Sequence, residues 1–207
     1  MTGWEAADRE LLVRLDGALE LAARRAGSHL ACRPGCIECC IGPFPITALD
    51  AWRLRRAFGE LEARDPSRAE AIRRRAEMAA ALMRADFPGD PQTGILAGEA
   101  EAAERFFERH AALPCPLLDP ATGLCELYEA RPLSCRTFGL PVRIGSEDLP
   151  PCRLCFRQAS AAEIEACRVV IDPEGIEDRL LAEAEDAESV IAFALIGIFA
   201  PEPRLGS

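Results

Sequence analysis

The chain has 207 residues, 49% hydrophobic and 28% charged, and contains 10 cysteines. This length and apolar content fit one folded domain with a hydrophobic core, and they exclude a disordered or low-complexity protein. The formal net charge of -10 argues against nucleic acid as a partner, because a phosphate backbone is bound by basic surfaces. All 24 basic residues are arginine, which excludes lysine chemistry such as Schiff-base formation.

The N-terminal part of the chain combines a helical pattern with a cysteine-rich stretch. The spacing of Leu11, Leu15 and Leu19 predicts an amphipathic helix over residues 5–26. Residues 32–45 follow, in which glycines and prolines between the cysteines are incompatible with a regular helix. We expect this stretch to be an irregular loop.

Residues 47–112 have the pattern of a helical insertion. Thr47 predicts the start of one helix and Ser67 the start of the next, because each precedes an acidic residue at the spacing of an N-terminal cap. Residues 86–98 are rich in proline and glycine and predict a loop, and residues 99–112 predict a further helix.

The second half of the chain contains another cysteine-rich segment and a C-terminal helix. Residues 113–157 hold five cysteines among prolines and glycines, with little periodicity. Ser160 and Glu163 predict the cap of a short helix that carries Cys167. A helix is predicted from about 175 to 200, and its apolar run is well short of the roughly 20 residues that span a bilayer. No internal repeat is apparent.

The number of cysteines indicates metal binding. The N-terminal residues are charged and show no secretory signal, so we expect a cytoplasmic protein whose thiols stay reduced. Thiolates two or three residues apart converge on one ion when a loop turns the chain back. The candidate ligands are Cys32, Cys36, Cys39, Cys40, Cys115, Cys125, Cys135, Cys152 and Cys155. Eight thiolates would make two sets of four, as a tetrahedral zinc site or a cubane cluster requires.

Three details of the cysteine pattern leave alternatives open. In an extended backbone, adjacent Cys39 and Cys40 would point to opposite sides, and would then serve two centres or bridge a multinuclear one. Cys155 would replace Cys152 as a ligand, join it, or be a redox-active thiol. Cys167 lies alone on a predicted helix, which is typical of a buried, inert thiol.

Charged residues near the cysteines also have two interpretations. Arg33, Arg131, Arg136 and Arg153 would neutralise thiolates and donate hydrogen bonds to sulfur, or they are merely some of the many arginines of the chain. His29 lies three residues before the first cysteine and is either a metal ligand or a histidine at a helix end.

The segments CRPGCIECC, CPLLDPATGLCELYEARPLSCRTFGLP and PPCRLC resemble the YkgJ-like cysteine-cluster family, which has a CxxCxxCC signature and is described as zinc- or iron-chelating. The resemblance covers about residues 32–155, although the first gap here has three residues in place of two. It implies chelation by Cys32, Cys36, Cys39, Cys40, Cys115, Cys125, Cys135 and Cys152. Some relatives are described as flagellin lysine N-methylases, so the resemblance also suggests protein modification as a function.

Together these patterns predict a single, mainly α domain whose helices scaffold irregular, cysteine-rich metal-binding loops. The first functional hypothesis is an iron or iron-sulfur protein in redox chemistry or protein modification. The second is a zinc-binding module with a structural or storage role that acts through a protein partner, and the third is a methylase-like enzyme. The sequence does not decide whether the protein is an enzyme.

Overall fold

The structure is a computed structural model that describes residues 3–184 and 187–201. Within this part of the chain it is mainly α, about 51% helical with three small sheets, which confirms the predicted fold class. The described residues form two compact units. Unit 1 comprises residues 3–33 and 133–183, and unit 2 comprises residues 34–132, 184 and 187–201. The single domain expected from the sequence stays a prediction.

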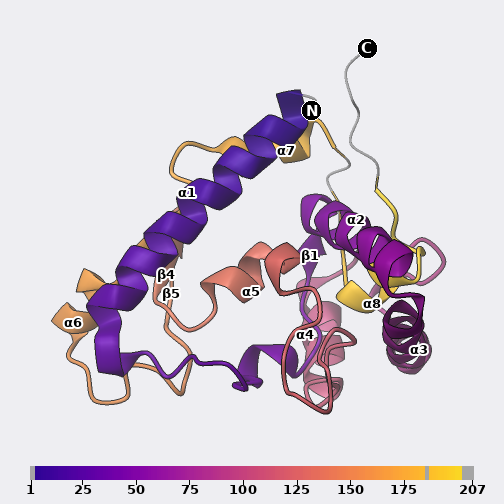
Figure 1. The fold of residues 1–207 in the computed structure, drawn as a ribbon, viewed down its shortest axis with the longest axis horizontal. Helices are drawn as coiled ribbons and strands as arrows, with labels where there is room; N and C mark the ends of the chain where they lie inside the picture. The colour runs from indigo at the N-terminus through magenta and orange to yellow at the C-terminus, as the bar shows by residue number, and fades with distance from the viewer. Residues whose placement is uncertain (1–2, 185–186, 202–207) are drawn as a thin grey trace. The chain divides into compact units, whose positions relative to one another are not determined.

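Unit 1 is organised around the long helix α1 (Gly3–Ala26), which confirms the predicted helix over residues 5–26. Its leucines at positions 11, 15 and 19 are buried, so the apolar stripe is the packing face. This helix packs against several short elements (Figure 1), namely α5 (Leu133–Thr137), α6 (Ala161–Ala166), β6 (Val169–Ile171) and α7 (Ile176–Ala182).

A small three-stranded sheet completes unit 1. Strand β4 (Val142–Ile144) lies in the centre, antiparallel to β5 (Glu147–Leu149) and parallel to β6. Ser160 and Glu163 form the predicted capping box at the start of α6, and Cys167 ends that helix in a buried position. This burial agrees with the interpretation of Cys167 as an inert core thiol.

Unit 2 is built on helices that pack side by side. Helices α2 (Ala48–Arg64), α3 (Pro66–Met83) and α8 (Ile191–Leu195) contact one another (Figure 1), and their contact faces supply most of its core. The shorter elements are η2 (Glu38–Cys40), α4 (Ala100–Arg109), η3 (Tyr128–Ala130) and two two-stranded sheets, β1 (Ile46–Thr47) with β7 (Glu188–Ser189), and β2 (Gly89–Asp90) with β3 (Ile95–Leu96).

Two predicted element boundaries differ from the structure. The loop over residues 86–98 contains the β2–β3 hairpin. In place of one helix over residues 175–200, the described residues form α7, strand β7 and α8, because β7 pairs with β1 and Gly197, at φ 75°, ends the helical turn after α8. None of the described helices combines the length and the apolar character that crossing a bilayer requires.

The start of α3 also differs from the prediction. Asp65 caps the helix, since its side-chain oxygen accepts a hydrogen bond from the Arg68 backbone N–H at 3.1 Å, and Pro66 occupies the first turn. Ser67, the predicted cap, lies inside the helix. Proline favours the first position of a helix, so the residue before it is the expected cap. The sequence alone therefore contained the signal for Asp65 as the cap.

We therefore expect Asp65→Ala to lower the free energy of unfolding by about 1 kcal/mol, because one N-terminal N–H loses its acceptor. Urea denaturation followed by circular dichroism measures the change. Ser67→Ala is the matched control and should change stability by only about 0.5 kcal/mol or less. The reverse order of the two effects would contradict the assignment of the cap.

Candidate metal centres

The ten cysteines are all thiols in the structure and are divided between the two units. Unit 1 contains four of the predicted ligands, which we call the unit 1 thiols: Cys32, Cys135, Cys152 and Cys155. Unit 2 contains the other five, the unit 2 thiols: Cys36, Cys39, Cys40, Cys115 and Cys125. Cys32 and Cys36 thus belong to different units although they are close in sequence, and each unit contains cysteines that are far apart in sequence.

Adjacent Cys39 and Cys40 lie in the 3₁₀ turn η2, and their sulfur atoms are 4.0 Å apart. The expectation of an extended backbone with side chains on opposite sides is therefore wrong. A 3₁₀ turn rotates successive side chains by about 120° rather than 180°, so neighbouring thiols can meet on one side. Two adjacent cysteines in this conformation can serve the same ion.

Backbone hydrogen bonds bring two further cysteines of unit 2 to this turn. The Cys115 N–H donates to the Cys40 carbonyl at 2.8 Å, next to an antiparallel bridge between Ile41 and Pro114. The chain then turns and forms a second bridge between Leu118 and Cys125. Cys40, Cys115 and Cys125 are thus held on neighbouring backbone segments, although 85 positions separate the first from the last.

The loop that carries Cys36 packs on the turn that leads to Cys125. A Cβ atom built on Gly123 would lie 3.7 Å from the Gly35 Cα atom and 3.6 Å from the Ile37 side chain. Gly35 and Gly123 both have positive φ angles, which these tight turns require. The contact places the Cys36 loop beside the other unit 2 thiols.

The turn before Cys125 is one of two copies of the sequence Asp-Pro-x-Thr-Gly, at residues 90–94 and 119–123. In both copies the first aspartate accepts hydrogen bonds from the backbone N–H two residues later and from the threonine hydroxyl. The first copy lies in a hairpin that pairs Gly89 with Leu96. The second copy lies between Leu118 and Cys125, which form an antiparallel bridge. The two turns thus share a five-residue pattern at an offset of 29 residues.

Electrostatics also link the thiols of unit 2. The hydrogen bond from the Cys40 thiol lowers the pKa of Cys39 to about 7, and the same bond raises the pKa of Cys40. Burial raises the pKa of Cys115 to about 12 and also raises that of Cys125, and the charge of Cys39 contributes to both shifts. These thiols are therefore close enough to influence one another.

Arg131 lies near this set, because its charge lowers the pKa values of Cys39 and Cys125. The guanidinium lies 3.8 Å from the centre of the Tyr128 ring and donates to the Tyr128 carbonyl at 2.8 Å, which fixes its position. Of the four arginines considered from the sequence, Arg131 is thus supported as a group that stabilises thiolates.

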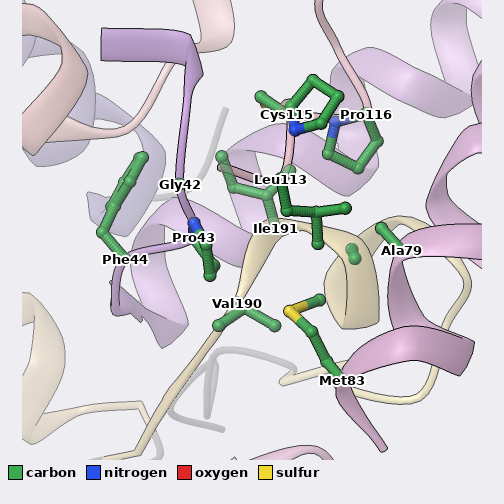
Figure 2. Close-up of a pocket in the computed structure, with 12 residues that line it drawn as sticks. Gly42, Pro43, Phe44, Ala79, Met83, Leu113, Cys115, Pro116, Val190 and Ile191 are labelled. Atoms are coloured by element: carbon green, nitrogen blue, oxygen red, sulfur yellow. The ribbon is translucent and has the colours of Figure 1, made fainter. Parts of the chain in front are cut away.

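Cys115, which is partly exposed, borders an apolar pocket of unit 2, shown in Figure 2. Leu113, Met83, Val190 and Ile191 line it together with the Cys115 segment. A thiol beside such a surface is poorly hydrated, so its charged form is disfavoured until a cation is present.

In unit 1, Cys32 and Cys155 form a thiol pair with sulfur atoms 4.0 Å apart. The Ala31 N–H donates to the Cys155 sulfur at 3.4 Å, and the Cys32 thiol donates to the Phe138 carbonyl at 3.9 Å. Gly139 passes directly over the pair: a Cβ atom there would lie 2.5 Å from the Cys32 sulfur. Only glycine fits this close approach.

The other thiols of unit 1 are carried by a tight turn and a short helix. Cys152 and Cys155 belong to one turn, because the Cys155 N–H donates to the Cys152 carbonyl at 2.8 Å. Cys135 lies on α5, four residues before Gly139. Its neighbour Arg136 forms an ion pair with Asp16 at 2.8 Å and thereby anchors α5 to α1.

Arg136 and His29 are explained by contacts other than thiolates. The buried Arg136 side chain is used by the Asp16 ion pair, which favours a role in holding the fold. His29 follows α1, stacks on the Phe156 ring at 5.8 Å and lies 3.7 Å from a Glu163 carboxylate oxygen. These contacts favour the interpretation of His29 as a helix-end histidine.

The chemistry and spacing of both pairs fit a thiolate-bound ion. With metal–sulfur bonds of about 2.3 Å, two ligands of one tetrahedral ion lie about 3.8 Å apart, close to the observed pairs. Each pair, Cys32–Cys155 and Cys39–Cys40, is separated by 4.0 Å. Within residues 3–184 and 187–201, no three cysteine, histidine or carboxylate side chains converge as a complete ligand group. The donors are thus assembled as pairs with further thiols on adjoining backbone.

Comparison with known proteins gives one match. A family model, CxxCxxCC, described as "Putative zinc- or iron-chelating domain", matches residues 31–155, which is more than half of the chain. Among curated proteins and among solved structures, no match was found. The matched range includes every unit 1 and unit 2 thiol and ends at Cys155. The chain therefore belongs to the CxxCxxCC family of zinc- or iron-chelating domains.

Proposed function

We propose that the chain binds two metal ions, one through the unit 1 thiols and one through the unit 2 thiols. The observation that carries this proposal is the thiol pair in each unit, with sulfur atoms 4.0 Å apart. Such a spacing matches two ligands of one mononuclear ion, and both pairs have further thiols of the same unit on adjoining backbone.

The composition of the two sets supports a structural function for the metal. Four or more thiolates close the coordination shell of zinc, whereas catalytic zinc sites keep one position for water or substrate. Because no complete ligand group is formed among the described residues, binding would draw further thiols of each unit toward its pair. Metal binding is then coupled to folding of the cysteine-rich loops.

Thiolates accept both zinc and iron, so the ligands alone do not select the metal. Two mononuclear centres should give about two zinc or iron atoms per chain and no acid-labile sulfide. Elemental analysis of protein purified without oxygen measures the count. An iron-sulfur cluster would instead give several irons with labile sulfide, and that result would overturn the mononuclear model.

A double serine variant tests whether each unit binds its own ion. Cys32→Ser/Cys155→Ser should remove about one ion per chain, because unit 1 loses two neighbouring thiols of its proposed ligand set. Cys167→Ala is the matched control, since this cysteine is buried in unit 1 outside the proposed ligand set. Loss of both ions from the double variant, or loss of an ion from the control, would contradict the model.

Unit 2 contains one thiol more than a tetrahedral ion needs. Single serine variants of Cys36, Cys39, Cys40, Cys115 and Cys125 should therefore divide into four that weaken metal binding and one that does not. A role of either centre in redox chemistry or protein modification, including methylase-like activity, needs an open coordination position. Binding of an exogenous thiol or cyanide to the cobalt-substituted protein, followed by absorption spectroscopy, would favour that alternative.

A further inference from the structure

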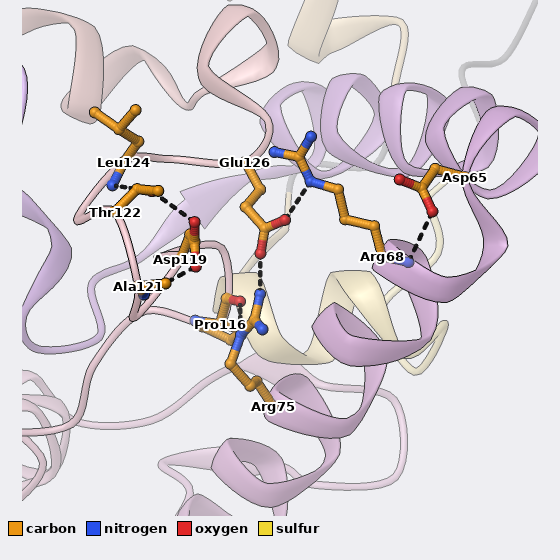
Figure 3. A network of polar contacts seen from close by, with 9 residues as sticks. All are labelled: Asp65, Arg68, Arg75, Pro116, Asp119, Ala121, Thr122, Leu124 and Glu126. Carbon is orange, nitrogen blue, oxygen red and sulfur yellow. Dashed lines mark hydrogen bonds and ion pairs between the residues drawn. The ribbon is translucent and has the colours of Figure 1, made fainter.

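An ion-pair network of unit 2, shown in Figure 3, involves the residues that follow two of its thiols. The Glu126 side chain is 7% exposed and accepts hydrogen bonds from Arg68 and Arg75, both on helix α3. Glu126 follows Cys125 in sequence, so the network fixes the backbone on one side of that thiol. A carboxylate this buried needs such partners, because leaving its charge uncompensated is costly.

Arg75 makes a second contact that extends the network to another cysteine. Its Nε atom donates to the Pro116 carbonyl at 2.8 Å, while its Nη2 atom pairs with Glu126. Pro116 follows Cys115, and Glu126 follows Cys125. One planar guanidinium therefore joins the residues that follow two proposed ligands, and ties both to α3 (Figure 3).

We propose that Arg75 is a positioning residue of the unit 2 metal centre, which fixes the separation of Cys115 and Cys125 through Pro116 and Glu126. This inference rests on the proposed function of the unit 2 thiols. Arg75 does not contact the ion. It lowers the cost of assembling the ligand set, because it adds side-chain contacts to the backbone bridge between Leu118 and Cys125 and ties both segments to α3.

The geometry makes Arg75→Lys the decisive variant. Lysine keeps the positive charge, but a single ammonium on a flexible stem does not reproduce the two directed contacts of the guanidinium. Arg73→Lys is the matched control on the same helix, where Arg73 pairs with Glu62 on α2 and Glu70 on α3. Both variants preserve the net charge of the chain.

The experiment follows zinc release from the zinc-loaded full chain to a colour-forming chelator. The release phase that disappears in Cys39→Ser/Cys40→Ser belongs to unit 2. We expect Arg75→Lys to accelerate this phase by about 10–100-fold and to leave the unit 1 phase unchanged, with Arg73→Lys like wild type. Glu126→Gln should act in the same direction as Arg75→Lys, because it weakens the same bridge.

An unchanged unit 2 phase in Arg75→Lys would overturn the inference while leaving the proposed function intact. Equal acceleration of both phases would also overturn it, because a general loss of stability affects both centres. If Cys39→Ser/Cys40→Ser retains the wild-type metal content, the proposed function itself fails. The metal count thus separates failure of the centre from failure of its positioning residue.

Discussion

Replacing Cys39 and Cys40 together by serine is expected to reduce the metal content from about two ions per chain to about one. The 4.0 Å pair in η2 belongs to the proposed unit 2 ligand set, and serine hydroxyls are poor replacements for thiolates at a soft metal. Loss of a bound metal is among the few changes that cost more than about 4 kcal/mol, so unfolding should shift to much lower temperature.

Calorimetry and elemental analysis of the same preparation test this expectation. Wild-type protein treated with a strong chelator should lose further stability, because unit 1 then also loses its ion. Cys167→Ala serves as the control: it should retain both ions and lose only about 1–2 kcal/mol, the cost of a small cavity in the core. A double serine variant that keeps two ions and the wild-type melting temperature would exclude these cysteines as ligands.

Gly139→Ala is expected to damage the unit 1 centre. The new methyl group would lie 2.5 Å from the Cys32 sulfur. The φ angle at this position is +109°, which residues other than glycine rarely adopt. Backbone strain and overpacking together should cost about 2–4 kcal/mol. Displacement of the Cys32 sulfur away from Cys155 should also weaken the unit 1 ion.

Alanine variants of two other glycines distinguish the effect of backbone strain from the effect of the clash with sulfur. Gly145, at φ +57°, and Gly98, at φ +136°, also have positive φ angles, but no atom lies within 4 Å of a Cβ built there. Their alanine variants should lose about 1–2 kcal/mol and keep the full metal content. If Gly139→Ala behaves like these controls in urea denaturation and in metal analysis, the close approach to Cys32 has no functional role.

Much of the helical framework could be predicted because its signals are local. Leu11, Leu15 and Leu19 mark the packing face of α1, and Thr47 caps α2 through a hydrogen bond from the Asp50 N–H at 3.2 Å. Such signals depend on residues three or four positions apart, which share a face or a turn of the helix. The C-terminal region was predicted less well, because the pairing of β7 with β1 depends on a strand about 140 residues earlier.

The identity of the ligands stays a prediction, and the grouping of the cysteines between the two units was not predictable from spacing. Spacing places Cys32 with Cys36, whereas the structure groups Cys32 with Cys155 and leaves Cys36 in the other unit. Cysteine spacing predicts only how the chain turns locally. Cys32 contacts Cys155 because the tertiary fold brings together residues that are far apart in sequence. Arg75 was missed for the same reason, since its contacts to Pro116 and Glu126 lie 41 and 51 positions away.

The discontinuity of unit 1 has a consequence for how the protein matures during synthesis. All unit 2 thiols lie between Cys36 and Cys125, so the ribosome delivers them as one uninterrupted stretch. Cys32 is made first of all, yet its partner Cys155 emerges only after that entire stretch. If unit 2 binds an ion as proposed, all five of its thiols are present on the nascent chain before Cys155 emerges, although its helix α8 is made later. An ion bound at that stage would keep the unit 2 thiols occupied and reduce wrong pairings until the unit 1 set is complete.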